Sequence, residues 1–62
     1  METIRTLQIE VEALNDLIEM YKEGLTPDLT KVERENFKNK IDFYEGVKKF
    51  KTNKIINLKN QN

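Results

Sequence analysis

Seven apolar residues follow a heptad pattern through the first half of this chain. Steps of three and four alternate along the set, so all seven lie on one side of an α-helix. They are Ile4, Leu7, Val11, Leu14, Ile18, Tyr21 and Leu25. Good helix formers dominate residues 3–23, and neither glycine nor proline interrupts them. A narrow seam of this kind must pack against another helix, which predicts an all-α fold.

The next residues predict a turn and a second helix. Gly24 is expected to stop the first helix in a left-handed conformation, and Pro27 lies in the turn. Two N-caps compete: Thr26 with Pro27 at the first helical position, or Thr30 in a capping box with Glu33. The earlier start is preferred. We therefore expect a hairpin over residues 1–53, with a helix over about 3–23, a turn over 24–28 and a helix over about 29–51.

A short turn between two long helices makes them antiparallel neighbours. With the turn centred near residue 27, the expected facing pairs at the open end are Ile4 with Phe50, Leu7 with Val47 and Val11 with Phe43. Residues 54–62 then extend past the first helix and are expected to form a frayed or flexible tail. Its apolar side chains either dock onto a partner or belong to a fraying helix end.

The chain is expected to associate with itself. With 62 residues and neither cysteine nor histidine, it has a small core and no disulfide or zinc site to support it. A second apolar row on the first helix and the flank of the second helix would be buried if two hairpins formed a four-helix bundle. The residues expected at this subunit interface are Ile9, Ala13, Leu17, Met20, Phe37, Ile41 and Tyr44. The alternative is a monomer that leaves this row exposed.

The expected bundle is similar in outline to the small plasmid RNA-binding helical hairpins that dimerise into four-helix bundles. The likeness is one of architecture, and no motif residue of that family is matched here. Serine, cysteine and histidine are missing, which removes the usual nucleophiles and proton shuttle. We therefore expect neither enzyme activity nor a cofactor. The acidic row formed by Glu12, Asp16, Glu19 and Glu23 is interpreted as a solvated helix face.

Four lysines near the end of the second helix are the candidate contacts for nucleic acid or another anionic ligand: Lys48, Lys49, Lys51 and Lys54. The net charge is zero, and from Gly46 onward the chain has five lysines and no acid. The preferred hypothesis is a protein–protein interaction module of the adaptor or inhibitor type. A nucleic-acid-binding dimer is the alternative, followed by a sponge for a small anionic ligand. No membrane span or signal peptide is expected, so a cytoplasmic location is the default expectation. The frequent Lys and Asn with little Arg suggest an AT-rich genome, that of a bacterium or phage.

Overall fold

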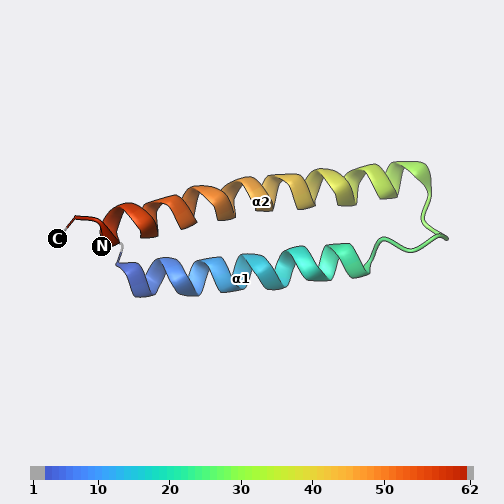
Figure 1. The fold of residues 1–62 in the computed structure, drawn as a ribbon. Helices are drawn as coiled ribbons and strands as arrows, with labels where there is room; N and C mark the ends of the chain where they lie inside the picture. The colour runs from blue at the N-terminus through green and yellow to red at the C-terminus, as the bar shows by residue number, and fades with distance from the viewer. Residues whose placement is uncertain (1–2, 62) are drawn as a thin grey trace.

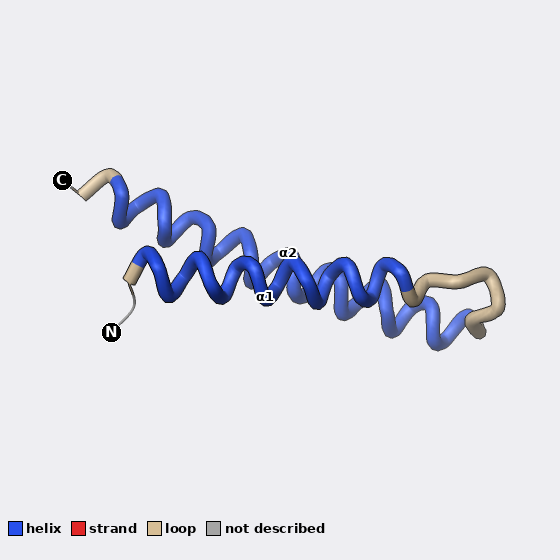
Figure 2. The backbone as a smooth tube through the Cα atoms, turned by 90° about the horizontal axis from the view of Figure 1, so that it is seen from below, coloured by secondary structure: helices blue, strands red, loops and turns tan. Residues whose placement is uncertain are grey.

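The chain forms an antiparallel hairpin of two helices. The structure is a computed structural model, and it describes residues 3–61. Helix α1 spans Ile4–Glu23 and helix α2 spans Lys31–Lys59. The hairpin is a rod about 50 Å long, with the connecting loop at one end and the start of α1 and the end of α2 at the other (Figure 1). Turned by 90°, the two helices cross at a shallow angle (Figure 2), as helices in bundles commonly do.

Both helices begin at a threonine whose hydroxyl satisfies a free backbone N–H. The N–H of Thr6 donates to Thr3 Oγ1 at 3.1 Å. The N–H of Glu33 donates to Thr30 Oγ1 at 3.1 Å, and the Glu33 carboxylate accepts from the Thr30 N–H at 3.0 Å. These two bonds complete a capping box. Of the two competing N-caps, Thr30 is therefore the one used, and the preferred earlier start is wrong.

The loop extends alongside α2 instead of reversing the chain tightly. The guanidinium of Arg34 donates to the carbonyl oxygen of Thr26 at 3.5 Å, so the loop lies beside the first turns of α2. Figure 1 shows that α2 begins further out along the rod than α1 ends. A tight turn would place Tyr44 opposite Glu10, but Glu10 forms an ion pair with Lys51, seven residues further on. The expected pairing is thus displaced by about two helical turns.

The burial of the predicted seam from Ile4 to Leu25 is confirmed, although Leu25 lies just beyond the end of α1. Its members Leu7, Leu14 and Ile18 are buried, and the other four are half-buried. On α2 the residues that face α1 are all buried or half-buried and form their own heptad. They are Phe37, Ile41, Tyr44, Lys48, Lys51, Ile55 and Leu58. The expected seam partners Phe43 and Phe50 lie outside this heptad and are 65% and 61% exposed, so their predicted inward position is wrong.

The second helix is longer than expected. It continues to Lys59 and does not end near residue 51, so residues 54–59 are helical, as in the helix-end alternative for the frayed or flexible tail. The displaced pairing of α1 with α2 explains why α2 is longer than expected. Leu7 and Ile55 lie one turn beyond the Glu10–Lys51 pair, and both side chains are buried. The last turns of α2 therefore have α1 beside them, and the burial of Ile55 stabilises their helical conformation.

Candidate interaction surface

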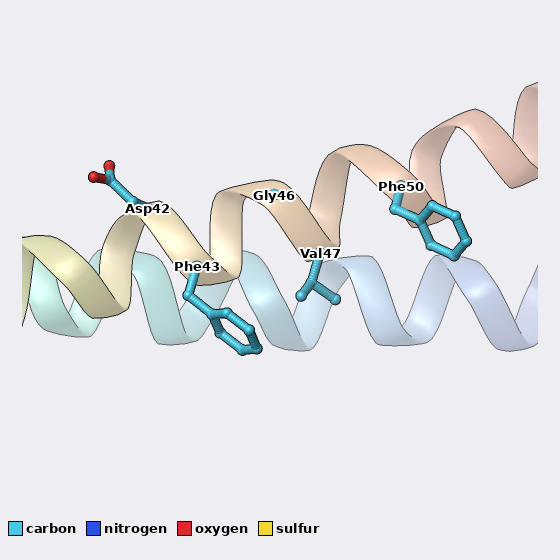
Figure 3. Close-up of a pocket in the computed structure, with 5 residues that line it drawn as sticks. All are labelled: Asp42, Phe43, Gly46, Val47 and Phe50. Atoms are coloured by element: carbon cyan, nitrogen blue, oxygen red, sulfur yellow. The ribbon is translucent and has the colours of Figure 1, made fainter.

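An exposed apolar surface runs along the middle of α2. We call it the Phe43–Phe50 surface, and it consists of Phe43, Gly46, Val47 and Phe50. Phe43 and Phe50 are seven residues apart, so they lie above one another on the helix, with Gly46 between them. Figure 3 shows Phe43, Val47 and Phe50 projecting from one side of α2, while Asp42 points away from its opposite edge. Two large aromatic side chains thus share one exposed face of the helix.

The surface contains two shallow hollows that meet at Phe43. One has a volume of about 410 Å³ and is lined by the four surface residues together with Asp42. The other, of about 470 Å³, is lined by Phe43, Asn36, Asn39 and Lys40. Both are open depressions bordered by side chains of one helix. This shape suits an elongated partner such as another helix rather than a small enclosed ligand.

Neighbouring aromatic rings support the surface from below. The ring of Phe43 contacts Tyr44 edge-on, with 5.6 Å between ring centroids. Tyr44 in turn stacks on Tyr21 of α1 at 5.9 Å. At the other end, the Lys54 ammonium lies over the Phe50 ring, 4.8 Å from its centroid. Each of the two exposed rings therefore has one contact with a neighbouring side chain of α2.

The α1 row predicted for the subunit interface lies on the same side of the hairpin. Glu10 and Lys51 pair across one edge of the helix–helix contact. Ala13 and Leu17 follow Glu10 by three and seven residues, and Val47 precedes Lys51 by four, so all three lie along that edge. The α1 row also contains Ile9 and Met20, which are 58% and 57% exposed. Within the same row, Ala13 is exposed and Leu17 is half-buried.

The α2 members of the predicted interface have a different position. Ile41 is buried inside the hairpin, so its predicted place on the outer surface is wrong. Phe37 and Tyr44 are half-buried and pack on Tyr21, at 5.5 and 5.9 Å between ring centroids. All three belong to the seam, because the displaced register turns this side of α2 toward α1. Phe43 and Phe50 take their place on the outside.

The four candidate lysines do not form a single patch. They are distributed around α2, since successive residues of a helix are rotated by about 100°. Lys48 and Lys51 are half-buried in the seam, where their aliphatic stems pack, and Lys51 pairs with Glu10. Lys54 lies over the Phe50 ring, and Lys49 is exposed. The structure therefore does not assemble the basic cluster that the sequence suggested.

Acidic groups occur on α1 and near the start of α2. Glu12, Asp16, Glu19 and Glu23 are all exposed, as expected for a solvated face. Hydrogen bonds from the backbone and side chain of Thr30 lower the pKa of Glu33 below its usual value. A hydrogen bond to the side chain of Thr26 lowers the pKa of Asp28. These shifts arise from helix capping and loop structure and do not indicate a catalytic site.

Residues 3–61 contain neither a metal-binding cluster nor a membrane-spanning helix. No group of three or more acidic, histidine or cysteine side chains in this range is arranged to hold a metal ion. Neither helix, as far as the described residues go, is long and apolar enough to cross a membrane. In comparisons with known proteins, no family model, curated protein or solved structure matched this chain. The evidence for the Phe43–Phe50 surface therefore comes from the residues of this chain alone.

Sequence reasoning missed the Phe43–Phe50 surface, although its signal is present in the sequence. Besides the seam, α2 carries a second heptad, displaced by one residue at its start. Its members are Asn36, Asn39, Phe43, Gly46, Phe50, Asn53 and Asn57. Asparagines occupy both ends of this second heptad, which hides the periodicity from a search for apolar residues. Only its centre is strongly apolar.

Proposed function

We propose that this chain is a protein–protein interaction module of the adaptor or inhibitor type, which acts as a self-associating helical hairpin. The observation that carries the proposal is the exposure of Phe43 and Phe50 on one face of α2, with an unobstructed glycine between them. Isolated exposed apolar residues are normal on protein surfaces. Two aromatic rings one heptad apart, beside a second apolar row on α1, form a surface that a partner helix can cover.

The energetic benefit of covering these rings is considerable for so small a protein. Burial of a phenylalanine side chain contributes up to about 3 kcal/mol, so covering the remaining three-fifths of each ring contributes roughly 1–2 kcal/mol. In a symmetric pair of hairpins this gain occurs twice. A two-helix hairpin has a small core of its own, so association adds a large share to its stability.

The absence of serine, cysteine and histidine from the sequence supports a binding role rather than a catalytic one. The arrangement of the lysines favours a protein partner over nucleic acid. Binding to a phosphate backbone uses several cations on one face, and here two of the four candidates belong to the seam. The cation of Lys51 is paired with Glu10.

Sedimentation equilibrium over a concentration series tests the proposal. We expect the mass to rise from 7.4 kDa toward twice that value with increasing concentration. The double variant Phe43→Ser/Phe50→Ser should remain at the monomer mass while its circular dichroism stays helical. Ile56→Ser is the matched control, because Ile56 is also exposed on α2 but points about 120° away from Phe50.

A wild-type chain that stays at the monomer mass throughout the series contradicts self-association. Retention on RNA or DNA at low salt, with loss at high salt, would instead support the nucleic-acid alternative. In that case the double phenylalanine variant should bind as well as the wild type. Salt-sensitive retention of the wild type, together with equal binding by the double phenylalanine variant, would replace the protein–protein proposal with the nucleic-acid alternative.

A further inference from the structure

We propose that the Phe43–Phe50 surface is covered by the same surface of a second copy, with the two α2 helices packed antiparallel. The inference rests on the proposed function, because it assumes that the hairpin associates with itself. It adds the identity of the contacting helix, the direction of the pair and the register. Three features of α2 carry it: an unobstructed glycine, the position of that glycine in the helix, and the distribution of charge.

Gly46 has no role within the hairpin that requires glycine. A β-carbon built at this position meets no heavy atom within 4 Å, whereas one built on Gly24 meets the Phe37 ring. Glycine inside a helix costs about 1 kcal/mol relative to alanine. At an exposed position between two aromatic rings, this cost is offset when a second helix approaches its backbone closely. Gly46 therefore marks the point of closest approach of a partner helix.

The position of Gly46 suits a symmetric pair of α2 helices. Gly46 lies one residue from the midpoint of Lys31–Lys59, so an antiparallel pair centred there overlaps along the whole of α2. With the two-fold axis between Tyr44 and Glu45, Phe43 of each copy lies opposite Gly46 of the other. Each ring then enters the hollow of about 410 Å³ beside Gly46. A two-fold pair makes this contact twice.

The charge distribution along α2 favours the antiparallel direction. Residues 46–59 carry five lysines and no acid, whereas residues 31–45 carry four basic and four acidic residues. A parallel pair places the two lysine-rich halves side by side, but an antiparallel pair places each beside a neutral half. Asp42 and Lys49 lie one heptad apart on the same edge of the surface, and both are exposed. In the register centred on Tyr44 and Glu45, Asp42 of each copy lies next to Lys49 of the other.

Cysteine crosslinking measures the direction and the register. The chain has no cysteine, so each introduced thiol is the only one. The antiparallel register places Asn36 of one copy level with Asn53 of the other. A mixture of the Asn36→Cys and Asn53→Cys variants should therefore give a mixed crosslinked dimer with a short bis-maleimide. Asn57→Cys alone should not crosslink, because the two copies of residue 57 lie about 38 Å apart along the axis.

The Gly46→Leu variant measures the close approach. Leucine is a better helix former than glycine, and its β-carbon would meet no heavy atom of the hairpin within 4 Å, so the monomer should become more stable. The same side chain fills the space that Phe43 of the second copy needs. We expect the dissociation constant of the dimer to rise about tenfold or more, equivalent to at least ~1.4 kcal/mol. A loss of association together with a gain in monomer stability cannot arise from misfolding.

The outcomes separate this inference from the proposed function. If the wild type is a monomer at every concentration, self-association fails and this inference fails with it. If the wild type associates, but Asn57→Cys crosslinks with itself or Gly46→Leu associates as tightly as the wild type, only the antiparallel α2 pair is overturned. If the two copies associate through the α1 row instead, the Asn36→Cys and Asn53→Cys variants give no mixed crosslink. That result also overturns the antiparallel α2 pair.

Discussion

The edge of the Phe37 ring lies where a side chain on Gly24 would have to be. A β-carbon built on Gly24 would be 2.6 Å from Cε2 and 3.3 Å from Cδ2 of Phe37. The ring also meets Tyr21 edge-on, which limits its freedom to move aside. Gly24 itself has a right-handed backbone with φ −74° and ψ −10°, so the expected left-handed helix stop is wrong. The glycine is needed here for space, because the loop passes close against α2.

Alanine at the two glycines should therefore have opposite effects on stability. Gly24→Ala forces the Phe37 ring aside, and we expect the free energy of unfolding to fall by about 1 kcal/mol or more. Gly46→Ala has open space and removes the entropic cost of glycine in a helix, so stability should rise by about 0.5–1 kcal/mol. Urea unfolding followed by circular dichroism at low protein concentration measures both. Equal effects of the two substitutions would contradict the close contact at Gly24.

Adjacent isoleucines test the extension of α2. Ile55 is 9% exposed and Ile56 is 49% exposed, although both lie in the last helical turns. Ile55→Ala should lower the free energy of unfolding by about 2 kcal/mol or more, because it leaves a cavity against α1. Ile56→Ala should change it by less than about 1 kcal/mol. If both substitutions are nearly neutral in thermal unfolding, the C-terminal turns do not pack on α1.

A lysine in the seam offers a stabilising substitution. Lys48 occupies a seam position between Tyr44 and Lys51 and is half-buried. Lys48→Leu keeps the packed stem, removes a charge from the contact with α1 and should stabilise the hairpin by about 1 kcal/mol. Lys49→Leu, at the exposed neighbouring position, should stay within about 0.5 kcal/mol. A pair of melting curves decides this, and a destabilised Lys48→Leu variant would show that the α2 seam is misplaced.

The capping box makes Thr30 the more important of the two candidate N-caps. Its hydroxyl accepts the Glu33 N–H, so Thr30→Ala should destabilise the hairpin by about 1 kcal/mol. For a chain of this size, that loss corresponds to a melting temperature lower by roughly 4–8 °C. Thr26→Ala removes only a loop hydrogen bond with Asp28 and should have a smaller effect. A larger loss at Thr26 would indicate that α2 begins earlier.

Acid should weaken the start of α2. The pKa of Glu33 is lowered by its hydrogen bonds with Thr30, and that of Asp28 by its hydrogen bond with Thr26. Groups with a lowered folded pKa stabilise the fold above their unfolded pKa, here near 4.5 and 3.8, and lose that contribution as the pH falls through the folded values. The melting temperature should therefore fall below about pH 4.5.

The variant Glu33→Gln isolates the contribution of the Glu33 charge. Glutamine still accepts the Thr30 N–H, so the capping box is retained, but its amide does not titrate. The fall in melting temperature below pH 4.5 should become smaller in this variant. An unchanged acid profile would show that other carboxylates cause the loss.

The architecture was predictable from sequence because its signals are local. The heptad from Ile4 to Leu25 depends on the spacing of apolar residues, and the capping box of Thr30 and Glu33 depends on two side chains three residues apart. The pairing of the helices was not predictable, since it depends on the path of the loop in space. A tight turn and a loop that extends along α2 have the same sequence but differ by about two helical turns in register.

This difference in register also explains why the candidate surface was misplaced. With the tight turn, Phe43 and Phe50 are the natural partners of Val11 and Ile4. The seam of α2 instead contains Lys48 and Lys51, which a search for apolar residues leaves out. Lysine can occupy such positions because its stem packs while its ammonium reaches the edge, as Lys51 does toward Glu10.

The start of α1 and the end of α2 lie at the same end of the rod (Figure 1), and this arrangement has a mechanical consequence. A pulling force applied at Thr3 and Lys59 would peel α1 away from α2, starting at the end opposite the loop. It would load the layer of Leu7 and Ile55 before any layer nearer the loop. Each layer would then yield in turn at low force. A force applied between Thr3 and Lys31, which lie at opposite ends of the rod, would instead pull α1 and α2 in opposite directions along their axes and would load the whole seam in shear at once.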